Sequence, residues 1–200
     1  MNWKVNVSSL LKDYELKHPP MIITVNKFNE DAAKEFSESM GLAHNTGQQI
    51  IPVLIDSYGG EVYSLMSMIS SIRSSKLPVA TIVQGKAMSC GAILFSFGKE
   101  GHRYMSPDAT LMIHDVSSFS GGKVEEIKVG AEETERLNKK VYTMMARNCG
   151  HEDDYFSNII HEKGHADWYL DGKEALKCGI ANHLKVPMIN VNINVDIEME

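Results

Sequence analysis

Short, nearly continuous apolar runs that alternate with segments of helical spacing constrain the fold of this chain more than any other feature. Such runs are typical of strands that are buried on both faces of a sheet. Four of them occur, at residues 21–25, 50–55, 78–83 and 110–113. Because helical patterns lie between them, the order of strand, helix and strand predicts an α/β domain with a largely parallel sheet and crossover helices.

Two of the intervening segments have clear helical patterns. Asn29 can cap a helix in which Ala32, Phe36 and Met40 recur every fourth residue. A second amphipathic face spans residues 62–73. We expect both helices to bury one side against the sheet.

A third helical segment, residues 124–147, is longer and more charged. Its apolar seam is narrow and comprises Ile127, Ala131, Thr134, Leu137, Val141 and Met145. A helix this polar is not wholly buried. Two interpretations remain open: the seam packs on its own domain, or the helix projects and packs against another subunit.

Length and composition exclude several classes of protein. With 200 residues, of which 43% are hydrophobic and 23% charged, the chain fits one globular domain. No apolar run approaches the ~20 residues that a membrane helix needs, and residues 1–20 lack the apolar block of a secretory signal. We therefore expect a cytoplasmic protein without a membrane partner. The three cysteines form no C-x-x-C pair, which suits a reducing compartment.

Charge is unevenly distributed along the chain. Residues 1–150 carry 16 acidic and 16 basic side chains, whereas residues 151–200 carry 10 acidic side chains and 4 lysines. The net charge of −6 thus lies in the last quarter, which ends in an acidic C-terminal tail at residues 185–200. From Ile189 onward the tail alternates apolar and polar positions, like an edge strand. No basic stripe with interleaved aromatic residues is present, so we expect no nucleic-acid partner.

Two glycine-containing turns follow predicted strands and are candidates for chemistry. In "VLIDSYGGEV", Gly59 and Gly60 lie between a strand and a helix, where backbone N–H groups can receive a developing negative charge. In "GKAMSCGAILF", Ser89 stands at a helix start, where it is either a cap or an exposed nucleophile. The amides of Cys90 and Gly59 can face the same point.

A nucleophilic serine needs a base, and the base needs an orienting group. His114 ends the apolar run in "ATLMIHDVSS", at a sheet edge where loops build active sites. Asp167, in "HEKGHAD", is a candidate for the orienting carboxylate. Taken singly, His114 and Asp167 could each be a structural or surface side chain without a catalytic role.

Taken together, these segments resemble the ClpP family, the proteolytic subunit of the Clp protease. The similarity rests on "DSYGGEV", "GKAMSCGAILF", "YMSPDATLMIHDVSSFSGGKVEEI" and "ADWYLDGKEALKCGIANHL", which occur in the family's order at about its spacings. It covers residues 21–184 and leaves residues 1–20 as a divergent N-terminal segment.

The resemblance implies a fold, a mechanism and an assembly. The fold would be a crotonase-like ββα core with a projecting handle helix at about residues 124–147. Ser89 would be the nucleophile, His114 the general base and acid, and Asp167 the orienting carboxylate. The amides of Gly59 and Cys90 would form the oxyanion hole, with no cofactor. Subunits would form a heptameric or double heptameric ring that acts on polypeptide substrates.

The sequence departs from the family pattern at the turn that presents the Gly59 amide, before Asp167, and at the N-terminus. Tyr58 stands where the family usually has proline before the glycine pair, and Ala166 replaces the arginine that commonly precedes the aspartate. The salt bridge between rings that this arginine makes cannot form here. Residues 1–20 do not resemble the family's axial-loop segment, which leaves docking to an AAA+ ATPase unfoldase open. The atypical N-terminus favours, mildly, a virus-encoded head-maturation protease of this fold, and a catalytically inactive ring scaffold is a further alternative.

The segment "HEKGH" also fits the H-E-x-x-H pattern of zinc peptidases. That site needs both histidines on one helical face, and Gly164 interrupts the helix between them. The extended form of the motif fails, because Trp168 and Asp171 occupy the glycine and histidine places. We therefore expect no metal, and interpret the segment as the helix end and turn that deliver Asp167.

Two further nucleophile and base pairs can be drawn from the sequence. Lys86 lies three residues before Ser89 and could form a Ser-Lys dyad, provided that burial depresses its pKa. Otherwise Lys86 extends to solvent. Cys90 could act as the nucleophile beside a histidine, but its place after Ser89 favours a role as an amide donor and packing group.

Overall fold

The computed structural model describes residues 19–119 and 121–190. The expectations for residues 1–18, and for a strand in the tail, lie largely outside these residues, and residues 185–190 contain no strand. Within the described residues no helix is both long and apolar enough to cross a bilayer.

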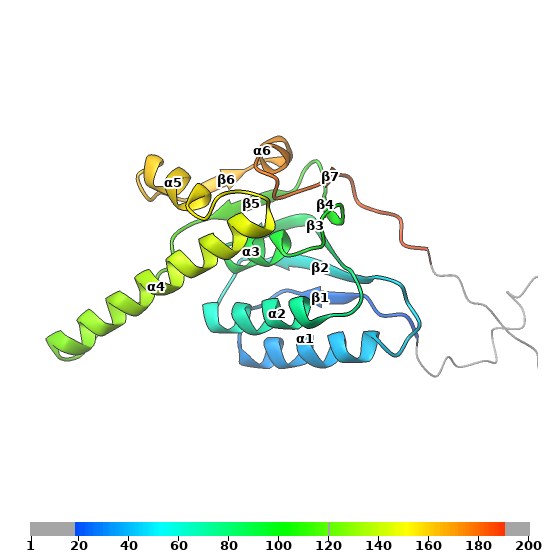
Figure 1. Ribbon diagram of the computed structural model, residues 1–200, viewed down its shortest axis with the longest axis horizontal. Coiled ribbons are helices and arrows are strands. Elements are labelled where there is room, and N and C mark those ends of the chain that lie inside the picture. The colour runs from blue at the N-terminus through cyan, green and yellow to red at the C-terminus, as the bar shows by residue number, and fades with distance from the viewer. Residues whose placement is uncertain (1–18, 120, 191–200) are drawn as a thin grey trace, which may run out of the picture.

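The core of the molecule is one mixed sheet of seven strands, and the predicted α/β class is confirmed (Figure 1). Its strands are β1 (Ile23–Val25), β2 (Ile51–Ser57), β3 (Val79–Met88), β4 (Arg103–Met105), β5 (Thr110–Ile113), β6 (Trp168–Leu170) and β7 (His183–Leu184). The order β1-β2-β3-β4-β7 is parallel throughout. Burial on both faces explains the continuous apolar runs of β2 and of the first half of β3, whereas the edge strand β1 is buried on one face and leaves Thr24 exposed.

The long strand β3 organises the end of the sheet that carries the candidate residues. Its first half pairs with β4 from Thr81 to Val83, and its second half pairs in parallel with β5 from Lys86 to Met88. β5 then pairs with β6 in the one antiparallel ladder among the described strands. The ends of β3 and β5 and the start of β6 therefore lie side by side.

Three helices follow the first strands and cover the sheet. They are α1 (Glu30–Ala43), α2 (Val62–Ser74) and α3 (Cys90–Ser96). Asn29 caps α1 as predicted, because its side-chain oxygen accepts the Ala32 amide at 2.9 Å. The buried face of α1 runs from Ala33 through Phe36 and Met40, and Ala32 is partly buried and packs at its edge.

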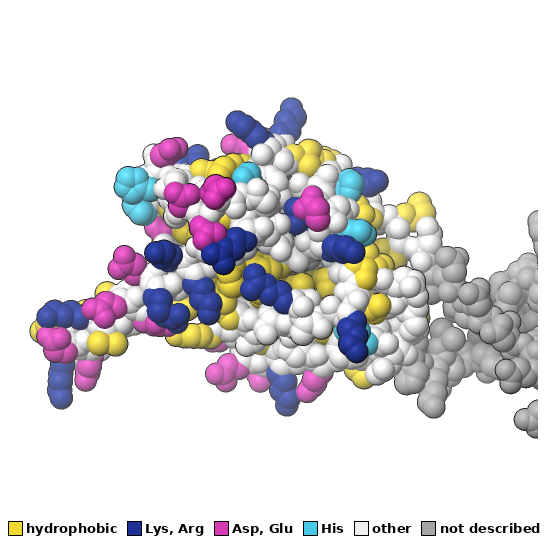
Figure 2. All heavy atoms as spheres, in the orientation of Figure 1, with side chains coloured by type: hydrophobic (Ala, Val, Ile, Leu, Met, Phe, Trp, Pro, Cys, Tyr) yellow, Lys and Arg dark blue, Asp and Glu magenta, His cyan; other side chains and the backbone are white. Residues whose placement is uncertain are grey.

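The long helix α4 (Val124–Asn148) is packed at one end only. Its buried residues, from Leu137 to Ala146, all lie in the C-terminal half. The N-terminal half extends beyond the rest of the domain (Figure 1), and Val124, Ile127 and Val129 are exposed there. In Figure 2 this projecting part carries basic, acidic and apolar side chains together. The C-terminal half of α4 thus packs on its own domain and the N-terminal half projects, while packing against another subunit stays a prediction.

Near the C-terminus, the helix α6 (Gly172–Lys177) and the strands β6 and β7 were not predicted from the sequence, and of the helix α5 (Tyr155–Glu162) only the end was. α5 packs against α4, and β6 follows the turn that contains Asp167. Elements of so few residues do not give a clear hydrophobic periodicity in the sequence.

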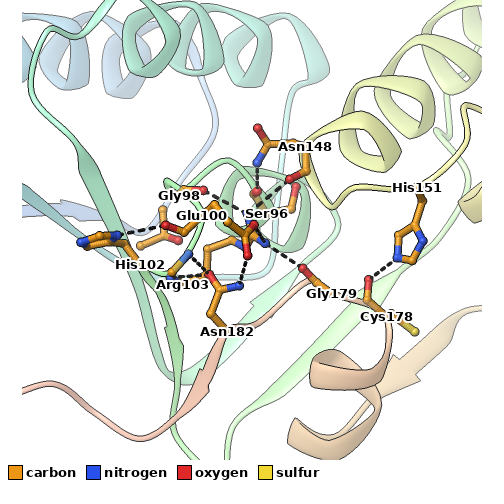
Figure 3. A network of polar contacts seen from close by, with 12 residues as sticks. Ser96, Gly98, Glu100, His102, Arg103, Asn148, His151, Cys178, Gly179 and Asn182 are labelled. Atoms are coloured by element: carbon orange, nitrogen blue, oxygen red, sulfur yellow. Dashed lines mark hydrogen bonds and ion pairs between the residues drawn. The ribbon is translucent and has the colours of Figure 1, made fainter.

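A buried arginine joins the chain segments at the far end of the sheet (Figure 3). Arg103 on β4 is 1% exposed, and its guanidinium donates to the carbonyls of Gly98, Asn148 and Gly179. It also pairs with Glu100 at 2.8 Å. One side chain thereby fastens the loop after α3, the end of α4 and the turn after α6 to the sheet.

Candidate active site

Ser89 occupies a strained turn between β3 and α3. Its φ of 54° and ψ of −120° lie outside the regions that L-residues prefer, and its side chain caps nothing in α3. The turn is held because the Ser89 amide donates to Met112 of β5 at 2.7 Å, and its carbonyl accepts the Ile93 amide. The capping interpretation of Ser89 is therefore wrong.

The glycine turn lies directly against Ser89. A Cβ atom at Gly59 would come within 2.8 Å of the Ser89 Cβ and 3.2 Å of its Oγ, and Gly59 has a φ of 105°. Only glycine fits there, because a side chain would meet Ser89 and would strain the backbone. In this conformation the Gly59 amide donates to the Ser57 Oγ at 3.1 Å, and that hydroxyl donates to the Asn26 carbonyl.

Cys90 is suited to the role of amide donor and unsuited to that of nucleophile. It is the first residue of α3, so its N–H has no acceptor within the helix, and none is provided elsewhere by the described residues. Its thiol is buried and donates to the Gly60 carbonyl at 3.3 Å. Burial raises the pKa of this thiol to about 11, so the nucleophilic thiolate is scarce at neutral pH. All three cysteines are unpaired.

His114 and Asp167 are brought together by the β5–β6 ladder. The last ladder pair is Ile113 with Trp168, so one further step of the antiparallel register places His114 opposite Asp167. The neighbouring ladder pairs Met88 with Met112, which places Ser89 beside the end of β5. Residues that lie 78 positions apart in the chain, 89 and 167, thus reach one edge of the sheet.

No hydrogen bond among the described residues joins Ser89, His114 and Asp167. His114 is half-buried and Asp167 is exposed. The structure therefore collects the three residues at adjoining strand ends, but it does not connect them into a hydrogen-bonded triad.

Two residues beside this site were not identified from the sequence. Asp115 follows His114, and its Oδ2 lies 2.6 Å from the Nδ1 of His165. Burial raises the pKa of the Asp115 carboxyl, but hydrogen bonds from Asn138, His165 and Tyr142 outweigh burial and lower it overall. The available signal was weak: an acid after the candidate base, and a histidine two residues before Asp167.

Lys86 does not meet the requirement of a Ser-Lys dyad. Its Nζ donates to Asp56 at 2.8 Å and lies 4.5 Å from the centre of the Tyr58 ring. The hydrogen bond to Asp56 raises the pKa of Lys86, whereas a catalytic lysine needs a lowered one. Nor does Lys86 simply extend to solvent: it contacts the two residues that lead into the Gly59 turn.

The "HEKGH" segment lacks the geometry of a zinc motif. α5 ends at Glu162, and Gly164 and His165 both have positive φ, at 67° and 60°, so the two histidines do not share a helical face. The Nδ1 of His165 binds Asp115. Across residues 19–119 and 121–190, no three histidine, cysteine or acidic side chains gather as a metal ion would require. The segment is the helix end and turn before Asp167, as interpreted from the sequence.

A groove of about 540 Å³ runs beside the site, between the chain after β5 and the helix α4. One wall is formed by Asp115, Val116, Ser117 and Ser118, and the other by Ile127, Ala131, Thr134, Glu135 and Asn138. The wall after β5 contains the start of the "SSFSGG" segment. An extended ligand that lay in this groove would reach the end of β5.

The fold and this strand-end geometry define an α/β protein with a serine on a strained turn beside a glycine turn, an arrangement typical of hydrolases that use an activated nucleophile. Comparison with known proteins identifies the family. A sequence model described as Clp protease matches residues 10–187. The ATP-dependent Clp protease proteolytic subunit of Streptococcus mutans serotype c is 31% identical over 136 residues, which are 67% of each chain. The chain belongs to the Clp protease family.

Proposed function

We propose that the protein is a serine endopeptidase that uses Ser89, His114 and Asp167. Ser89 attacks the scissile carbonyl while His114 takes its proton, and Asp167 holds the imidazole in the productive orientation. His114 then protonates the leaving amine, and water repeats the cycle on the acyl-enzyme. Membership of the Clp protease family supports the reaction class.

The observation that carries this proposal is the conformation of Ser89. A non-glycine residue with left-handed φ at the junction of a strand and a helix costs about 1–3 kcal/mol. The conformation keeps the side chain of Ser89 from capping α3 and sets it against the Gly59 turn, beside the end of β5. A serine that only capped a helix would not need this strained backbone conformation.

The proposed oxyanion hole consists of the Gly59 and Cys90 amides. The Cys90 amide is free, whereas the Gly59 amide is bonded to Ser57. In the mechanism a substrate oxyanion replaces the Ser57 hydroxyl as the acceptor, because a charged acceptor makes the stronger hydrogen bond. The mechanism also requires a hydrogen bond between the side chains of His114 and Asp167, which follow and precede the last β5–β6 ladder pair.

Covalent labelling tests this proposal. We expect a peptidyl phosphonate to add one adduct per chain, detectable by intact mass and mapped by peptide sequencing to Ser89. A chelator should leave peptide hydrolysis unchanged. An adduct that fails to form, or that maps to Cys90, would contradict the mechanism. Peptide hydrolysis that is lost with chelator but resists the phosphonate would favour a metal peptidase.

We further propose that the protein works as a ring of identical subunits, of heptameric or double heptameric form. The exposed half of α4 supports this, since three apolar side chains project from the domain there without a cover. We expect native mass measurement at micromolar concentration to give a multiple of 22.3 kDa. A species of 22.3 kDa alone would rule out the ring. Substituting Ile127 by Asp should shift the mass downward, because a charge there opposes apolar contact.

A further inference from the structure

We propose that the Asp115–His165 pair is a positioning clamp that sets the separation of His114 and Asp167. The inference rests on the proposed function of these two residues. Neither member of the clamp touches the reacting atoms in this mechanism. Its role is to hold together the two strand ends that carry the base and the orienting carboxylate.

The register of the sheet shows why a clamp is needed. The backbone ladder between β5 and β6 stops at Ile113 and Trp168, one step before His114 and Asp167. Beyond that step, the next hydrogen bond between these two segments joins the Nδ1 of His165 to the Oδ2 of Asp115, at 2.6 Å. The candidate pair is thus enclosed between a ladder pair on one side and a side-chain bond on the other.

The loop before β6 has little else to hold it in place. Its backbone bonds lead back to α5, as in the bond from the His165 amide to the Ile160 carbonyl. Within the described residues, the bond to Asp115 is the single hydrogen bond that joins residues 163–167 to the chain after β5. Without that bond, the loop is attached to α5 and β6 alone, and no hydrogen bond among the described residues ties it to the segment that follows His114.

Asp115 is itself fixed by the long helix. Its Oδ1 accepts from Asn138 at 2.7 Å and from Tyr142 at 3.2 Å, while Asn138 also accepts the Val116 amide. These bonds leave Oδ2 free to bind His165. The clamp therefore rests on the packed half of α4, which is a rigid support.

The backbone of His165 adds independent support. Among the described non-glycine residues, only Ser89 and His165 have positive φ, and both flank the candidate site. A φ near 60° is uncommon for a residue with a side chain, and glycine would adopt it more easily. The strained histidine persists where its side chain makes the bond to Asp115, as expected when local strain serves a function.

Two substitutions at this position separate the clamp from the backbone. His165→Gly relieves the strain and removes the bond, whereas His165→Asn also suits the backbone and places an amide Nδ2 where the imidazole Nδ1 lies. We expect His165→Gly to lower kcat for a peptide substrate by about tenfold, since small displacements of catalytic groups have effects of this size or larger. KM should change less than about twofold, and His165→Asn should restore most of kcat.

The controls distinguish the possible failures. Glu162→Ala, on the same turn, removes an exposed side chain that makes no polar contact to a described residue and should have the wild-type kcat. If His165→Gly does not fold, His165→Asp serves instead, because its carboxylate repels Asp115 and should lower kcat at least as much. A wild-type kcat in either variant, or an asparagine variant as slow as the glycine variant, would overturn the clamp. A wild-type protein that forms no Ser89 adduct overturns the proposed function instead.

Discussion

Replacing Ser89 with alanine is expected to lower kcat for peptide hydrolysis by about 10⁶-fold, measured with a fluorogenic peptide at saturating concentration. Members of a triad act as one unit, so the loss of the nucleophile removes covalent catalysis altogether. The residual rate would come from substrate binding and the amides of Gly59 and Cys90. The fold should remain, since the Ser89 side chain caps no helix.

The control for this variant is Ser74→Ala, which removes a hydroxyl at the end of α2 that bonds only within its own helix. That variant should retain the wild-type rate. Native mass and circular dichroism should match for the two variants. A Ser89→Ala protein that keeps a tenth or more of the rate would show that another residue is the nucleophile.

Replacing Arg103 with alanine is expected to have the largest effect on stability, about 3 kcal/mol of the free energy of unfolding. The change leaves the buried carbonyl of Gly98 and the partly buried carbonyls of Asn148 and Gly179 without this donor, and it removes a fully buried side chain (Figure 3). For a chain of this length the melting temperature should fall by roughly 10 °C. Denaturation at one fixed protein concentration measures both quantities.

Glu100→Gln tests whether the carbonyls or the ion pair account for this effect. Glu100 is 76% exposed, so its pairing with Arg103 is screened by water and should contribute less than about 1 kcal/mol. If Glu100→Gln destabilises the protein as much as Arg103→Ala, the loss of stability comes from the ion pair and not from the hydrogen bonds of Arg103 to the three carbonyls.

The sequence predicted much of the fold because the relevant signals are local. The runs at 21–25, 50–55, 78–83 and 110–113 each coincide with a strand or the first part of one. Burial on both faces accounts for the unbroken apolar sequence of β2 and the start of β3, while β1 and β5 are fully buried on one face only. The cap at Asn29 and the helix at 124–147 were also predicted closely, because capping and periodicity depend on neighbouring residues. β6, by contrast, has three residues, and nothing in so short a segment reveals its antiparallel partner.

The candidate site could be predicted in part. Ser89, Gly59 and Cys90 belong to turns whose residue types suggest their chemistry, and the turns do lie against each other. Asp115 and His165 were missed, because their importance depends on a contact between residues 50 positions apart. The contact of Lys86 with Tyr58 was missed for the same reason: the sequence marks Tyr58 as a departure from the family and Lys86 as a possible base, but their contact is visible only in the structure.

By itself the sequence determined the class of the domain, the places of its main strands and helices, and the residue types available for acyl transfer. These follow from hydrophobic burial and backbone propensity, which act over a few residues at a time. Only the tertiary structure decided that the β5–β6 ladder ends at Ile113 and Trp168, next to His114 and Asp167, and that Asp115 and His165 bind each other beyond it. Those arrangements depend on the register between distant strands, which is set by packing across the whole sheet.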